Sequence, residues 1–191
     1  MSINENLLVR KAQHGNLAAF EELVSMYDEK VMNLILNMVN NVEDARDIYQ
    51  EVFLKVFLTI KAFRFKSKFY TWLFRIAINT SINYRKKRTL KQVLPLWDNE
   101  NEQGDDGESF VLDQTTNPER KFLNVELSSN IQQSINRLSS KQKTVFVLRH
   151  YLGYKLSEIA EIMACAEGTV KNYLFRSVQK LQRELKEFQH N

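Results

Sequence analysis

The segment from Val52 to Lys91 combines a single sign of charge with many aromatic rings. It contains eleven Lys or Arg residues, nine aromatic residues and no Asp or Glu. Positive charge attracts phosphates, and a flat ring is a stacking surface for an unpaired base, worth about 1–3 kcal/mol. About half of these rings are expected to be core, as aromatic residues at helical spacing usually are. The run from Arg85 to Arg88 is too dense in charge to be core, so the segment indicates nucleic-acid binding.

A second set of residues able to read bases lies near the carboxyl end. The sequence predicts a short helix over 156–163, a tight break at 164–166 and a longer helix opening near Gly168. This spacing is typical of a helix-turn-helix, whose second helix enters the DNA major groove. The expected inward positions are Ile159, Ala160, Met163, Val170 and Leu174, and the outward positions are Lys171, Asn172, Phe175 and Arg176. Lys and Arg can contact phosphates or guanine, Asn can read adenine, and Phe can contact a thymine methyl. A plain helical hairpin with a solvated outer face is the alternative interpretation.

The charge of the chain is distributed unevenly. Eight acidic residues and no basic one lie between Val93 and Glu119, and without those eight the net charge rises from +4 to +12. The two flanking parts are therefore predicted to bind a polyanion. The single cysteine, Cys165, suits a reducing compartment, and neither a signal-peptide pattern nor an apolar run of about 20 residues is present. We expect a cytoplasmic protein that does not insert into membranes by itself.

The turn-forming residues divide the chain into three parts. Four of its seven Gly and Pro residues lie between Val93 and Glu119, among acids and amides. This composition predicts a flexible acidic linker over 93–118, joining a helical domain at 1–92 to a second at 119–191. Hydrophobic spacings of three and four recur on both sides and no strand alternation is seen, so the predicted fold is all-α.

Several helix boundaries carry local signals. Asn16 is an expected N-cap for a long helix, preceded by a short helix over 5–14 that ends at Gly15. Further helices are predicted over 43–62 and 70–90, with a loop from Phe63 to Phe69 between them. In the second half, Ser139 and Gln142 predict a capping box for a helix that runs to residue 150. The sequence Asn117-Pro118-Glu119 is a predicted helix start.

Taken together, these motifs resemble the bacterial RNA polymerase sigma factors of the extracytoplasmic-function (ECF) group. Residues 47–53 (DIYQEVF) are similar to the family's Asp-x-x-Gln-Glu-x-Phe, and residues 69–79 (FYTWLFRIAIN) to its Phe-x-Thr-Trp-Leu-x-Arg-Ile-Ala-x-Asn. The second half carries LSSKQKTVFVL at 138–148, SEIA at 157–160 and GTVK at 168–171. The resemblance covers nearly the whole chain. It departs from the family's common residues at Asn83 and at Asn172-Tyr173, which leaves the base preference open.

The resemblance implies a role for each part. A polar helix face would bind the clamp of the polymerase's largest subunit, through Asp44, Asp47, Gln50 and Glu51. The basic-aromatic segment would melt and hold the promoter −10 element, through Phe63, Phe69, Tyr70, Arg75, Asn79, Arg85, Lys86 and Arg88. Of these, Phe69, Tyr70 and Asn79 are expected at the base pocket and the basic residues on phosphates. The helix-turn-helix would read the −35 element as duplex, through Arg149, Thr169, Lys171, Asn172, Phe175 and Arg176.

The resemblance also implies partners, and two other functions remain as alternatives to it. The implied partners are core RNA polymerase, promoter DNA and a separate anti-sigma protein. Catalysis, cofactors and metal sites are not expected. A stand-alone helix-turn-helix regulator is the first alternative, although it leaves the basic-aromatic segment without a role. The second is a metal-dependent nuclease built on Glu43, Asp44, Asp47 and Glu51. It is disfavoured because metal ligands converge from several elements, whereas the three His residues are scattered.

Overall fold

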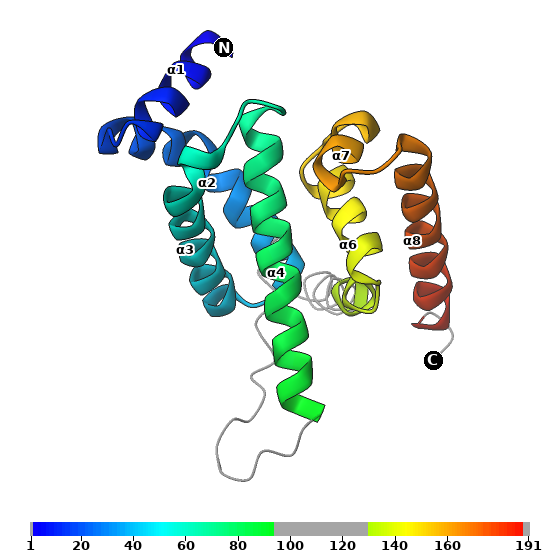
Figure 1. The fold of residues 1–191 in the computed structure, drawn as a ribbon. Helices are drawn as coiled ribbons and strands as arrows, with labels where there is room; N and C mark the ends of the chain where they lie inside the picture. The colour runs from blue at the N-terminus through cyan, green and yellow to red at the C-terminus, as the bar shows by residue number, and fades with distance from the viewer. Residues whose placement is uncertain (1, 94–129, 189–191) are drawn as a thin grey trace, which may run out of the picture.

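The computed structural model describes residues 2–93 and 130–188, and these form helices joined by short turns and loops without any strand. The amino-terminal helices are α1 (Ser2–Gln13), α2 (Leu17–Val39), α3 (Val42–Thr59), the short 3-10 turn η1 (Ile60–Ala62) and α4 (Phe69–Val93). The carboxy-terminal helices are a short one over 130–136, α6 (Ser140–Phe146), η2 (Val147–Tyr151), α7 (Leu156–Met163) and α8 (Glu167–Phe188) (Figure 1). The all-α prediction is confirmed. The predicted linker begins one residue too early, because Val93 is the last residue of α4, and the rest of it lies outside the described residues together with the predicted helix start at Asn117-Pro118-Glu119.

Local capping chemistry sets the boundaries of the amino-terminal helices. Gly15 ends α1 with φ +87°, in the region that favours glycine. The Asn16 side chain then accepts a hydrogen bond from the Ala19 amide at 3.0 Å and starts α2. Asn41 does the same for α3 by accepting from the Asp44 amide at 2.8 Å. These caps turn the chain sharply twice, so that α1 and α3 each pack on α2, and α4 packs on α2 and α3.

The carboxy-terminal helices contain the predicted capping box and a π-helical segment that was not predicted. Ser139 and Gln142 form the predicted capping box at the start of α6. The helix does not continue to residue 150 as an α-helix, because its last part, η2, has the wider π-helical hydrogen bonding. The Leu152 amide accordingly donates to the Val147 carbonyl at 3.2 Å. Single π-turns of this kind are often found at functional positions.

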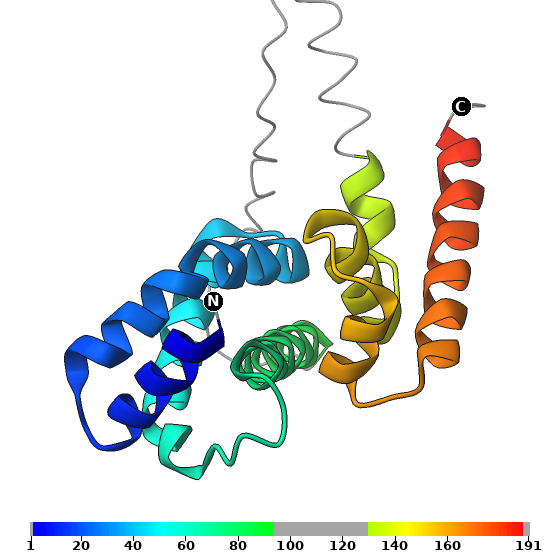
Figure 2. The same cartoon turned by 90° about the horizontal axis from the view of Figure 1, so that it is seen from above.

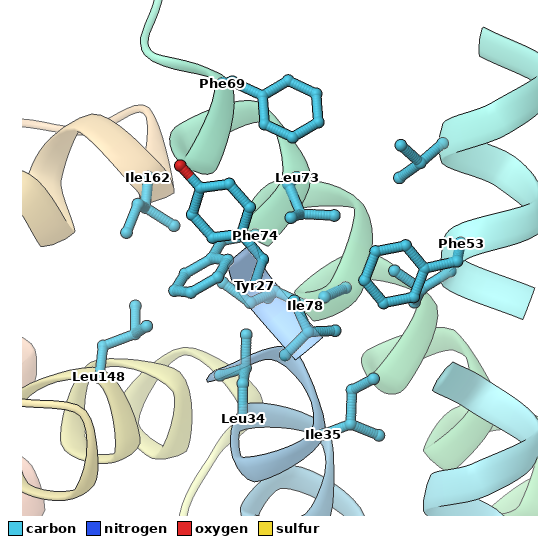
Figure 3. Close-up of a cluster of buried hydrophobic side chains, with 14 of the residues drawn as sticks. Tyr27, Leu34, Ile35, Phe53, Phe69, Leu73, Phe74, Ile78, Leu148 and Ile162 are labelled. Carbon is cyan, nitrogen blue, oxygen red and sulfur yellow. The ribbon is translucent and has the colours of Figure 1, made fainter. Parts of the chain in front are cut away.

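The helix-turn-helix has the predicted spacing. Helix α7 covers Leu156–Met163, Ala164 takes the left-handed conformation with φ +51°, and α8 follows at Glu167. Ile159 and Ala160 face inward as predicted. The third inward residue is Ile162, which is 2% exposed, whereas Met163 is only half-buried. Helix α7 is thus rotated slightly from the sequence-based expectation, and Ile162 turns toward the amino-terminal helices (Figure 3).

The two groups of helices share a hydrophobic core. Leu148 of η2 and Ile162 of α7 pack into the same cluster as Tyr27, Leu34 and Phe74 of α2 and α4 (Figure 3). Seen from above, η2 and α7 lie next to α2 and α4, and α8 lies on the outer side, away from the amino-terminal helices (Figure 2). Within the described ranges, no helix is both long enough and apolar enough to cross a bilayer.

Candidate promoter DNA and polymerase interfaces

The outer face of α8 presents polar and aromatic side chains to solvent. Phe175 is 62% exposed, which is unusual for so large an apolar residue. The buried side of the same helix contains Val170 and Ser177, and the Ser177 hydroxyl reaches the Gln142 carbonyl of α6 at 3.2 Å. This inner face fixes α8 against α6 and α7, so the outer face is held rigidly. The side chains exposed on that face are Thr169, Lys171, Asn172, Phe175 and Arg176.

Arg149 lies on η2, before the helix-turn-helix. Its guanidinium is exposed and donates to the Tyr154 carbonyl at 3.0 Å. All six residues predicted for duplex binding are therefore exposed. Their side chains supply phosphate donors, an amide that can pair with a base edge and an apolar ring, which are groups that proteins use in the major groove.

The aromatic residues of the loop before α4 pack mainly on one another. The rings of Phe63 and Phe69 meet edge to face with centroids 5.8 Å apart, and Trp72 lies within 5.2 Å of Phe63. Phe63 is 6% exposed and Phe69 2% exposed. The structure thus brings two predicted −10 residues together, but inside the core, where neither ring is open to a base. Phe65 is the exposed ring of this loop, with φ +56°, and sequence spacing alone had not distinguished it from its neighbours.

The basic face of α4 is partly free and partly engaged. Asn79 and Lys86 are exposed. In contrast, the Arg75 guanidinium donates to the carbonyls of Glu161 at 2.5 Å and Ile162 at 3.0 Å, at the carboxyl end of α7. A helix carboxyl end carries partial negative charge, which suits a cation.

Two more predicted −10 residues also contact the carboxy-terminal helices. The ring of Tyr70 stacks on Tyr154 with centroids 5.9 Å apart, and Arg85 donates to the Asn136 carbonyl at 3.2 Å. One guanidinium nitrogen of Arg85 is buried without a hydrogen-bond partner, and burial lowers the pKa of this group.

Lys143 is fully buried near Arg85 and donates a hydrogen bond to the Asn136 side chain at 2.5 Å. Burial, reinforced by the positive charge of Arg85, lowers the pKa of Lys143 to about 7. No pattern in the sequence indicates that this lysine is buried.

The polar face of α3 divides into two parts. Asp47, Gln50 and Glu51 are exposed. Asp44 instead turns toward α4, where it accepts hydrogen bonds from the Tyr84 hydroxyl at 2.6 Å and from Arg88 at 2.5 Å. The bond from Tyr84 to Asp44, together with burial, raises the Tyr84 pKa to about 12.

Among the described side chains, no group of three or more His, Cys, Asp or Glu residues is arranged to hold a metal ion. The acidic positions considered for a nuclease do not form such a group.

The fold and these surfaces define a DNA-binding transcription factor with a helix-turn-helix and a separate basic-aromatic helical face. The model of sigma-70 region 2 matches residues 23–90, and that of sigma-70 region 4 matches residues 128–181. The RNA polymerase sigma-H factor of Pseudomonas aeruginosa is 35% identical over 93% of this chain and 92% of its own. The ECF RNA polymerase sigma-E factor of Haemophilus influenzae is 34% identical over 96% of each chain. The chain belongs to the ECF group of the sigma-70 family. It is a sigma factor, which directs RNA polymerase to promoters and starts transcription.

Solved structures show the same fold. CnrH, in complex with the cytosolic domain of CnrY, matches with a TM-score of 0.67 at 19% identity, over 96% of this chain and 98% of its own. RpoE from Bartonella quintana, in complex with the anti-sigma factor NepR, matches with a TM-score of 0.61 at 19% identity, over 87% of this chain and 96% of its own.

Proposed function

We propose that the amino-terminal domain, residues 1–93, holds core polymerase and the melted −10 element, while the domain at 119–191 reads the −35 duplex. The acidic segment at 94–118 joins them. The exposed outer face of α8 is the observation that carries this proposal most strongly. There Lys171, Asn172, Phe175 and Arg176 all point to solvent from a helix whose inner face is packed. Leaving a large ring such as Phe175 exposed has no benefit for folding, which supports a binding role.

The −10 element is assigned to the loop before α4 and to the basic face of that helix. Asn79 and Lys86 are available for base and phosphate contacts, and Tyr70, Arg75 and Arg85 join them when the carboxy-terminal helices move away. Arg88 contributes through its position next to these residues, although it is paired with Asp44. Phe63 and Phe69 support the loop from beneath, and the exposed ring of Phe65 is better placed to stack on a base.

The binding of core polymerase is assigned to the exposed part of α3. Asp47, Gln50 and Glu51 provide carboxylate and amide groups in successive turns of the helix, and Asp44 fixes the helix to α4 through Tyr84 and Arg88.

The polymerase assignment is tested with purified core polymerase and a fluorescently labelled chain. Changing Asp47 and Gln50 to Ala together should weaken binding at least tenfold. The control variant changes Glu22 and Glu29, exposed acids of α2, to Ala, and it should bind as the wild type does. Equal affinities for both variants would show that α3 is not the contact.

We further propose that the protein acts without catalysis of its own, in the cytoplasm where polymerase and promoters are found, and that an anti-sigma protein controls it. One similar structure, RpoE with NepR from Bartonella quintana, is a complex of a sigma factor with an anti-sigma factor. Recovery of polymerase alone from the native host, under conditions where the regulon is silent, would argue against the anti-sigma partner.

A further inference from the structure

Two positively charged side chains meet at the end of the short helix over 130–136. Arg85 of α4 donates to the Asn136 main-chain carbonyl at 3.2 Å, and Lys143 of α6 donates to the Asn136 side-chain oxygen at 2.5 Å. A single asparagine therefore accepts from both cations. The other terminal nitrogen of Arg85, Nη1, is buried and has no hydrogen-bond partner.

Within the described part of the chain, neither cation has a counter-charge. Burial and then the charge of Arg85 lower the pKa of Lys143, and burial alone lowers the pKa of Arg85, so no described carboxylate contributes to either shift. Charged groups on the surrounding helices are paired with one another: Arg88 with Asp44, and both Arg137 and Lys180 with Glu184. Buried charges are costly unless they are paired, so an anion beside Arg85 and Lys143 would remove a large penalty.

The burial of the two groups restricts the size of such an anion. Lys143 is completely buried, whereas the Arg85 side chain is partly exposed, so an ion can reach the site along Arg85. An enclosed amine admits a small ion rather than a nucleic-acid strand or a protein surface. A guanidinium fork pairs with two oxygens of one ion, and an ammonium adds a point charge, which together suit an oxyanion of the phosphate type.

We propose that Arg85 and Lys143 form a binding site for a small oxyanion of the phosphate class, which joins α4 to α6 through one bound ion. The proposal is independent of the role assigned to Arg85 at the −10 element, because the site is tested without DNA or polymerase. Lys143 must carry its proton to hold the ion, and its pKa in the protein without the ion is about 7. The affinity for the ion should therefore be higher near neutral pH than in alkaline solution.

Thermal unfolding of the full chain, followed by circular dichroism, tests the site with inorganic phosphate as the probe. Lys143→Met removes the amine and Arg85→Gln removes the guanidinium, whereas Lys141→Met is the matched control on the exposed side of α6. Potassium chloride keeps the ionic strength constant. Phosphate also stabilises proteins generally by exclusion from their surfaces, so the difference between the four proteins is the informative quantity. The spectra before heating establish that each variant retains its helices.

The melting temperature of the wild type and of Lys141→Met should rise by about 3–5 °C when phosphate reaches about ten times its Kd. Lys143→Met and Arg85→Gln should show no saturable rise. An equal rise in all four proteins, or no saturable rise in the wild type, would overturn the proposal.

Sulfate is the second probe, because its charge does not change in this pH range. Its affinity for the wild type should be lower at about pH 9 than at about pH 7, by about tenfold or more. An unchanged affinity would show that Lys143 is not part of the site. Promoter binding with core polymerase judges the proposed function separately, since the phosphate and sulfate titrations contain neither component.

Discussion

Replacing Lys143 with Met should remove a pH dependence of stability that the wild-type protein has above pH 7. The lysine is completely buried, and its pKa in the folded protein is about 7 against an ordinary value of 10.5. Between those two values the unfolded chain carries a proton that the folded chain lacks. The free energy of unfolding therefore rises with pH in this window, and below about pH 7 this group adds no further change.

The size of the effect follows from the two pKa values. One pKa unit corresponds to about 1.4 kcal/mol, so the whole window represents roughly 5 kcal/mol. Between about pH 7.5 and 9 this group should raise the free energy of unfolding by about 2 kcal/mol. Methionine has a similar length and no charge, but it leaves the Asn136 oxygen without its donor, at a cost of about 1–3 kcal/mol. The change in stability with pH is consequently the informative quantity, rather than the absolute stability.

Urea unfolding followed by circular dichroism at the two pH values measures this change. Lys141→Met is the matched control, because Lys141 lies on the same helix and is exposed. Between the two pH values, the free energy of unfolding of the wild type and of Lys141→Met should each rise by about 2 kcal/mol more than that of Lys143→Met. An equal gain in all three proteins would refute the reasoning, since it would mean that Lys143 keeps an ordinary pKa in the folded chain.

Three smaller predictions concern caps, a turn and DNA contacts. Asn41→Ala should lower the free energy of unfolding by about 1 kcal/mol, measured by urea unfolding, because the Asp44 amide loses its acceptor. Gly15→Ala should cost about 1 kcal/mol in thermal unfolding through backbone strain alone, since a Cβ there meets no atom within 4 Å, and Gly15→Asn should cost less. Lys171→Ala should weaken binding of −35 duplex by the polymerase complex and, if Lys171 contacts a phosphate, reduce the slope of log affinity against log salt by about 0.9. An unchanged slope would assign Lys171 to a base instead.

Local signals predicted much of this fold. Three features depend on only a few neighbouring residues and can therefore be predicted from local sequence: the caps at Asn16 and Ser139 and the break at Ala164. The exposed face of α8 was predicted equally well, because the spacing of Val170 and Leu174 determines which side of the helix is buried.

The contacts between the two groups of helices were not predictable in this way. Nothing near Arg75 in the sequence indicates that its donors meet carbonyls more than eighty residues away. The sequence around Lys143 predicts a solvated charge, whereas in the structure the neighbouring helices bury it. Phe69 reads as a stacking platform, and only its packing against Tyr27 and Phe63 shows that its ring is part of the core. Such features depend on tertiary packing rather than on local propensity.

Transcription in a purified system tests the central claim most directly. Core polymerase is mixed with the protein and with a fragment library of the source genome, and the transcript starts are mapped. The account predicts initiation at discrete sites sharing a −35 and a −10 motif, lost when Asp47 and Gln50 are both changed to Ala and retained in the Glu22 and Glu29 control. DNA binding by the protein alone, with no initiation in the presence of polymerase, would contradict it and favour a stand-alone helix-turn-helix regulator.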